Sequence, residues 1–212
     1  MVPPERDRKI SGFFIFMKEI VPKDSRYIPF TQQRSSCVPT CIWMIMYKQK
    51  IPLIAQELLG YHLGLTVAPE FRYLFWNARK GKKPRAGYGT RLSGREVDPN
   101  KVFSSLKIPL RMTYRPINQF PNVASFKNYI SDAVKKDKDV IVCFDFGTLN
   151  DLPERDGHVS VIDRLVGKDS VRLIDPSPRF PKWRIFKLSK LKKALEVHGE
   201  KKHAGFWEFK KI

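Results

Sequence analysis

The chain has 212 residues, and 42% of them are hydrophobic, which is enough for a buried core and excludes wholesale disorder. Lysine and arginine number 40 against 21 acidic residues, which gives a net charge of +19. This excess indicates an acidic substrate, an anionic surface or nucleic acid as a partner, unless the lysines only solvate the surface. Three cysteines argue against a disulfide framework, and no apolar run approaches the roughly 18 residues of a membrane span, so we expect a protein of the reducing cytoplasm.

An N-terminal arm of residues 1–26 is expected to precede a single domain of residues 27–212. Residues 1–10 are rich in proline and charge, as loose chain ends often are. Residues 13–21 include an apolar run that predicts an edge strand or a packed arm.

A buried helix is predicted from Cys37 to about Lys48, where a polar stretch gives way to an apolar one. Pro39 suits the first turn of a helix, and Ser35 or Ser36 can cap the same end. A cysteine at this end lies near the positive pole of the helix dipole, which favours the thiolate. Cys37 is therefore a candidate nucleophile. The alternative is a small buried hydrophobic residue.

The next segments predict two helices and a basic loop. Residues 51–60 are expected to form a short helix that ends at Gly60, and residues 69–79 a helix with an aromatic, core-facing side. Residues 79–95 contain seven basic side chains, no acid and four glycines, so we expect a mobile loop. This loop is a lid or an anion-binding loop, with Lys80, Lys82, Lys83 and Arg85 as candidate ligands for an anion, or else a solvated insertion.

The second half of the chain is rich in predicted strands. Helices are expected at 98–106, 125–134 (with a serine cap) and 189–197, and strands at 110–114, 140–144, 157–163, 170–175, 183–188 and, as a closing edge strand, 205–209. Because helices come first and strands follow, the order favours an α+β fold.

One predicted hairpin places a histidine near a carboxylate. His158 precedes the turn at residues 166–169 by about as many positions as Asp175 follows it, so the two are expected to face each other within about two positions. Asp163 lies five residues after His158 and should point to the opposite face. His198 and His203 stand among lysines and are expected to be solvated. A cysteine, a histidine base and an orienting carboxylate make up a thiol catalytic triad.

Three motifs in this order resemble the papain-like cysteine peptidases, specifically the bacteriocin-processing (double-glycine leader) peptidases and their stand-alone relatives. The motifs are Gln32-Gln33 followed by Cys37-Val38-Pro39-Thr40-Cys41, then Gly157-His158-Val159, then Leu173-Ile174-Asp175-Pro176. Val38 stands where the family usually has glycine. The oxyanion glutamine of the family lies six residues before the cysteine, where this chain has Thr31.

The resemblance implies a two-lobed papain-like fold, with a helical lobe over about 27–106 and a sheet lobe over about 107–212. It also implies a thiol hydrolase that acts on a peptide or amide bond and needs no cofactor or metal. The substrate would be a peptide or protein, and the basic charge of the chain suggests that this substrate is acidic. Cys37 would be the nucleophile, His158 the base and Asp175 its orienter. Gln32, or else Gln33, would stabilise the oxyanion.

Other functions stay open at the level of the sequence. The same fold supports a deamidase or an acyl transferase, and the charge fits a non-catalytic protein that binds nucleic acid or another polyanion. Cys37, Cys41 and a histidine could instead bind zinc, although structural zinc usually takes four ligands. Cys41, one helical turn after Cys37, is expected to pack beneath the site.

Overall fold

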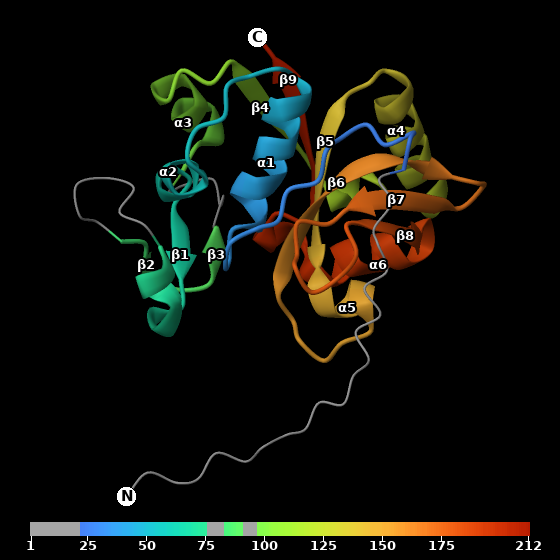
Figure 1. The fold of residues 1–212 in the computed structure, drawn as a ribbon. Coiled ribbons are helices and arrows are strands. Elements are labelled where there is room, and N and C mark those ends of the chain that lie inside the picture. Colours follow the sequence, from blue (N-terminus) through green and yellow to red (C-terminus); the bar gives the residue numbers. More distant parts are fainter. Residues whose placement is uncertain (1–21, 76–82, 91–96) are drawn as a thin grey trace, which may run out of the picture.

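The computed structural model describes residues 22–75, 83–90 and 97–212, and it combines helices with two β-sheets (Figure 1). The expected α+β class is therefore confirmed. The strand or arm expected at residues 13–21 lies outside the described residues. The end of the helix expected at 69–79 and parts of the basic loop expected at 79–95 also lie outside them, because residues 76–82 and 91–96 are not described. None of the helices in the described part of the chain is long and apolar enough to cross a membrane.

Six α-helices and nine strands form this part of the chain. The helices are α1 (Cys37–Lys48), α2 (Gln56–His62), α3 (Pro99–Ser105), α4 (Val123–Lys135), α5 (Phe146–Asn150) and α6 (Leu188–His198). Short 3-10 helices cover Pro69–Leu74, Ile117–Gln119 and Glu200–Lys202. The strands are β1 (Leu65–Val67), β2 (Arg85–Ala86), β3 (Gly89–Thr90), β4 (Leu110–Pro116), β5 (Asp139–Asp145), β6 (Gly157–Val166), β7 (Ser170–Ile174), β8 (Trp183–Lys187) and β9 (Gly205–Lys211).

The larger sheet has the order β4-β9-β5-β6-β7-β8, with every neighbouring pair antiparallel. Strand β9 lies between β4 and β5, so the prediction of an edge strand at the C-terminus was wrong. Phe206, Trp207 and Phe209 are buried on the two faces of this strand, which fits a central position. The sequence pattern shows that these residues are buried but not which strands flank them.

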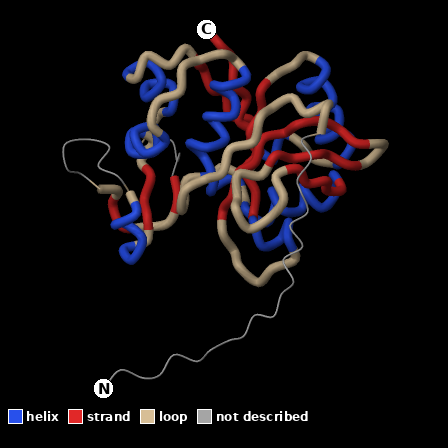
Figure 2. The backbone as a smooth tube through the Cα atoms, viewed as in Figure 1, coloured by secondary structure: helices blue, strands red, loops and turns tan. Residues whose placement is uncertain are grey.

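Both faces of this sheet are covered, as Figure 2 shows with helices on either side of the strands. In β5, Ile141 and Cys143 share a core with α1, whereas Val140, Val142 and Phe144 share a second core with α4 and α6. A strand that is buried on both faces reads as a continuous apolar run, which is why β5 was predicted as an inner strand.

Helix α1 has the predicted bounds, with Pro39 in its first turn. The predicted serine cap is absent, because the Ser36 side chain makes no bond to the helix and its Oγ donates to the carbonyl of Arg34 at 3.2 Å. Ser35 has φ 61°. The turn is instead stabilised by Thr40, whose Oγ1 donates to the carbonyl of Ser36 at 2.6 Å.

Three other predicted elements have different bounds. Helix α2 begins at Gln56 and continues through Gly60, where an added Cβ would lie 2.9 Å from Leu65 Cδ2; this glycine permits close packing and does not end the helix. Residues 69–74 form a 3-10 helix where an α-helix was predicted. Helix α4 is capped by Asn122, with Ser125 as the third residue of a capping box, so the predicted serine cap was misplaced.

The described part of the basic loop contains regular structure. Strand β2 pairs in parallel with β1, with Arg85 opposite Thr66, and β3 pairs with β1 on its other edge. The expectation of a loop without regular structure was therefore wrong for residues 85–90.

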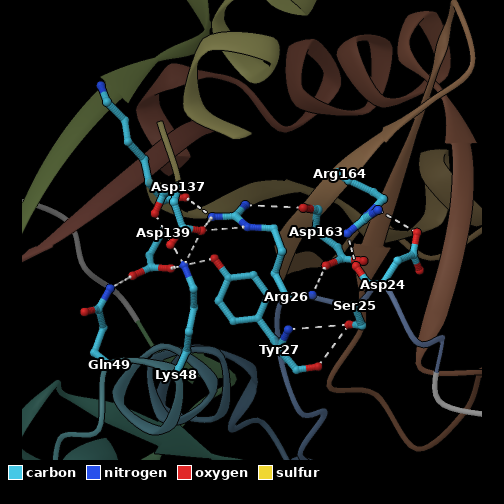
Figure 3. Close-up of polar contacts among 11 residues, drawn as sticks. Asp24, Ser25, Arg26, Tyr27, Lys48, Gln49, Asp137, Asp139, Asp163 and Arg164 are labelled. Carbon is cyan, nitrogen blue, oxygen red and sulfur yellow. Dashed lines mark hydrogen bonds and ion pairs between the residues drawn. The ribbon is translucent and has the colours of Figure 1, made fainter. Parts of the chain in front are cut away.

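A polar network fixes residues 24–27 and the end of α1 to the larger sheet (Figure 3). The backbone N–H of Arg26 donates to Asp163 Oδ1 at 2.8 Å, and the Tyr27 hydroxyl donates to Asp139 Oδ1 at 2.7 Å. Lys48, the last residue of α1, donates to the same Asp139 oxygen at 2.8 Å. Burial, and then the Asp139 charge, raise the pKa of Tyr27 well above its usual value. These bonds orient the helix whose other end bears Cys37.

Candidate active site

Cys37 and His158 border one cavity of about 370 Å³. Cys37 is the first residue of α1, and His158 is the second residue of β6, which packs against that helix. The remaining lining residues are Val38, Tyr88, Gly89, Thr90, Cys143, Gly157, Val159, His198, Lys201, Lys202, His203 and Trp207. The helix end and the sheet thus present a thiol and an imidazole to the same space.

The imidazole of His158 is paired with a buried carboxylate. Its Nε2 lies 2.8 Å from Asp175 Oδ1, and both residues are buried. Asp175 follows β7 directly, and Ile174 pairs with Val161, so Asp175 lies about two positions from a place opposite His158. The rings of Phe144 and Phe146 contact the imidazole edge-on, with centroids 5.7 and 5.0 Å away. These two ring contacts restrict rotation of the imidazole.

The electrostatics of this pair favour the charged form of both partners. Burial alone would lower the pKa of His158, but the charge and hydrogen bond of Asp175 and the contact with Cys37 raise it to about 10. Burial opposes ionisation of Asp175, yet His158, the N–H of Ser177 at 2.9 Å and the Arg184 guanidinium hold its pKa below the usual value. Because Nε2 faces Asp175, Nδ1 is the ring nitrogen left for Cys37.

The two candidate glutamines lie outside the cavity lining. The backbone N–H of Gln32 donates to the carbonyl of Pro176 at 2.9 Å, next to Asp175, and its Oε1 is buried without a protein partner. The Gln33 side chain points to α2, where its Nε2 donates to Glu57 at 2.6 Å. The backbone of Gln32 is therefore bonded to the residue after Asp175, whereas the side chain of Gln33 is engaged by α2.

The two candidate anion-binding residues that the structure describes do not border the cavity. Lys83 and Arg85 are exposed and absent from its lining, and Lys80 and Lys82 lie outside the described residues. The same segment nevertheless contributes Tyr88, Gly89 and Thr90 to the lining, so it reaches the site through other side chains.

Two histidines that were expected to be solvated border the cavity instead. His198 is buried at the end of α6, and an added Cβ on Gly157 would lie 2.7 Å from its Cε1. The His203 ring packs on Tyr114 with centroids 5.3 Å apart. The helical spacing of Leu191, Leu195 and His198 would have placed His198 on the apolar face.

The other two cysteines are buried in the core. The Cys41 thiol is fully buried and donates to the carbonyl of Val159 at 3.6 Å, and burial raises its pKa well above the usual value. Burial also raises the pKa of Cys143, which borders the cavity from β5. Among the described residues, no three His, Cys, Asp or Glu side chains are placed to hold one metal ion.

Comparison with known proteins identifies the fold. No protein-family model matches the chain, and no curated protein matches it. The structure resembles the crystal structure of a candidate C39-like peptidase from Bacillus anthracis, with a TM-score of 0.51 and 16% sequence identity over 87% of this chain and 95% of that chain. The chain therefore has the fold of a C39-like peptidase.

Proposed function

We propose that the protein is a cysteine hydrolase of peptide or amide bonds, with Cys37, His158 and Asp175 as its triad. The observation that supports this most strongly is the buried 2.8 Å contact between His158 and Asp175, made beside the cavity that His158 shares with Cys37. The shared fold with a C39-like peptidase supports the same reaction class. In this proposal α1 belongs to a helical lobe and the larger sheet to a second lobe, as in papain-like enzymes.

The proposed reaction begins when the Cys37 thiolate attacks the carbonyl carbon of the substrate. The imidazolium of His158 then protonates the leaving amine, and the acyl group stays on sulfur. His158, now neutral, takes a proton from the water that attacks the thioester, which releases the acid and restores the Cys37 thiolate and the His158 imidazolium. Asp175 holds the ring so that one nitrogen faces the sulfur throughout.

The oxyanion would be stabilised at the start of α1. The N–H groups of a first helical turn have no acceptor within the helix, so that of Cys37 is available as a donor. We propose Gln32 as the second donor, because the Nε2 of Gln33 is already bonded to Glu57.

Alkylation by iodoacetamide tests the triad. We expect mass spectrometry to find the label on Cys37 first, and His158→Gln to slow its alkylation at neutral pH about 10- to 100-fold, because the imidazolium no longer stabilises the thiolate. The control is Cys143→Ala, a second cavity-lining thiol, which should leave the rate at Cys37 unchanged. Preferential labelling of Cys143, or an alkylation rate at Cys37 that is unchanged in His158→Gln, would contradict the proposal.

Hydrolysis, deamidation and acyl transfer share this thiol chemistry and differ in their products. A peptide panel read by mass spectrometry separates shortened peptides from peptides that have gained about 1 Da or an acyl group. Of these three reactions we propose cleavage of the peptide chain.

We also propose that Lys83 and Arg85, in the exposed part of the basic segment, attract acidic partners.

A further inference from the structure

A short basic turn forms one wall of the cavity that contains Cys37 and His158. We call Lys201, Lys202 and His203 the basic wall; they follow α6 and precede β9, and all three border the cavity. Lys201 and Lys202 are exposed, and His203 is half-buried. Two lysines thus border the same cavity as the candidate nucleophile.

The described residues that border this cavity include no aspartate or glutamate. Glu200, which precedes the wall in the chain, is not part of the lining, and its Oε2 accepts a hydrogen bond from Asn118 Nδ2 at 2.6 Å. Burial, and then the charge of Lys202, lower the pKa of His198, and burial lowers that of His203. At neutral pH the positive charge of the wall therefore belongs mainly to its lysines.

The backbone of the wall is held by several hydrogen bonds. The N–H of Lys202 donates to the carbonyl of Gly199 at 3.1 Å, and that of His203 donates to the carbonyl of Glu200 at 2.8 Å. The Tyr114 hydroxyl donates to the carbonyl of Ala204 at 2.9 Å, while its ring packs on His203. A backbone held in this way need not be ordered when a ligand binds, which reduces the entropy lost on binding.

We infer that the basic wall binds a carboxylate of the peptide substrate, next to the bond that Cys37 attacks. This inference rests on the proposed function and adds a substrate class to it. Two lysines that border a cavity with no carboxylate among its described lining residues favour an anionic group in that space. The Debye length of about 8 Å at physiological ionic strength is comparable with the width of such a cavity, so the attraction is only partly screened.

The charge of the wall can be measured with two alkylating reagents of nearly equal size. Iodoacetate is an anion and iodoacetamide is neutral, so the ratio of their rates at Cys37 reports the local potential and cancels the intrinsic reactivity of the thiol. We expect Lys201→Gln/Lys202→Gln to lower this ratio about three- to tenfold at low salt. The effect should fade at 1 M salt.

A matched control removes two positive charges elsewhere. Lys193 and Lys210 are exposed and do not border the cavity, so Lys193→Gln/Lys210→Gln should leave the ratio within about 1.5-fold of wild type at the same salt. Lys201→Arg/Lys202→Arg should keep the wild-type ratio. The inference would be overturned if the rate ratio fell equally in both double glutamine variants, or if it did not fall in Lys201→Gln/Lys202→Gln.

Peptides identify the source of the carboxylate. End-blocked peptides with Glu or Gln beside the cleaved bond test an acidic side chain, and Gln peptides with a free C-terminus test the terminal carboxylate. We expect one carboxylate-bearing set to be cleaved faster than its neutral counterpart, and the wall variant to lose this preference. Equal cleavage of charged and neutral peptides would contradict the inference. If no peptide is cleaved, the proposed function fails, and the reagent ratio still decides whether the wall attracts anions.

Discussion

Two buried aspartates on neighbouring parts of the β6–β7 hairpin have different partners. Asp175 contacts His158 beside the cavity, whereas Asp163 accepts from the N–H of Arg26 and, at 2.6 Å, from the Arg172 guanidinium. Asp163 sits at a bulge where the pairing of β6 with β7 shifts register. One carboxylate therefore belongs to the candidate triad, and the other anchors residues 24–27 (Figure 3).

Replacing each aspartate by asparagine should separate these roles. We expect Asp175→Asn to lower turnover about 10²- to 10⁴-fold, as loss of the orienting acid does in triads, and to slow alkylation of Cys37. Asp163→Asn should leave the alkylation rate within about threefold of wild type but lower the free energy of unfolding by about 1–3 kcal/mol, because a buried charged hydrogen bond is lost.

Alkylation kinetics and urea unfolding, measured on both variants, test this assignment. Reversed results, with slow alkylation in Asp163→Asn and a fast rate in Asp175→Asn, would mean that Asp175 does not orient the imidazole. A urea midpoint of Asp163→Asn equal to that of wild type would show that the anchor contributes nothing to stability.

At the scale of elements, local sequence rules located most helices and strands but not all of their neighbours. The bounds of α1 and the place of the β6–β7 hairpin follow from apolar runs and turn residues that stand in the sequence itself, although β6 continues to Val166, three residues beyond its predicted end. The central position of β9 depends on pairing with β4 and β5, which precede it by many residues. The role of Gly60 depends on Leu65 and Pro39, which pack where its Cβ would be.

The same contrast holds for the candidate site. Cys37, His158 and Asp175 have types and positions that predict a triad. His198 and His203 gave no such signal, because their places on the cavity depend on how α6 and the following turn dock onto the sheet. A lysine-rich sequence predicts a solvated segment, and the burial of His198 depends on tertiary contacts of α6, among them those with β5 and with Gly157 of β6.

The contact between β6 and α6 can be tested at Gly157. An added Cβ would lie 2.7 Å from His198 Cε1, so Gly157→Ala should lower the free energy of unfolding by about 1–3 kcal/mol and reduce the alkylation rate of Cys37 by displacing His158. In a His198→Ala background the same substitution should cost less than about 0.5 kcal/mol.

Gly167 offers a control in the turn after β6. It has φ 59° and no atom near its missing Cβ, so Gly167→Ala should be destabilising through backbone strain, by about 1 kcal/mol, with or without His198. Equal costs of Gly157→Ala in the two backgrounds would show that the histidine does not limit this position.

At the scale of the whole molecule, α1 and the larger sheet share one hydrophobic core. Cys41, Ile42 and Ile45 of the helix are fully buried in the cluster that also contains Val159 of β6 and Trp207 of β9. The Asp139 carboxylate binds Tyr27 and Lys48 at the far end of the same helix. The helix that bears the candidate nucleophile is therefore joined to the sheet along its length, and we expect the two to unfold together.

Two probes in one denaturant titration test this coupling. In a Trp43→Phe background, which removes the tryptophan of α1, the remaining emission includes that of Trp183 and Trp207 and reports loss of tertiary structure in the sheet. Pulse-alkylation of Cys41, read by mass spectrometry, reports exposure of the helix. We expect coincident transitions in this background. Asp139→Asn should lower both midpoints equally and reduce the free energy of unfolding by about 2–4 kcal/mol, since Lys48 and Tyr27 lose a buried charged partner. Asp132→Asn, which removes an exposed pair with Lys136, should change stability by less than about 0.5 kcal/mol. Exposure of Cys41 well before the change in emission would show that α1 detaches first and that the shared core does not couple the candidate nucleophile to its base.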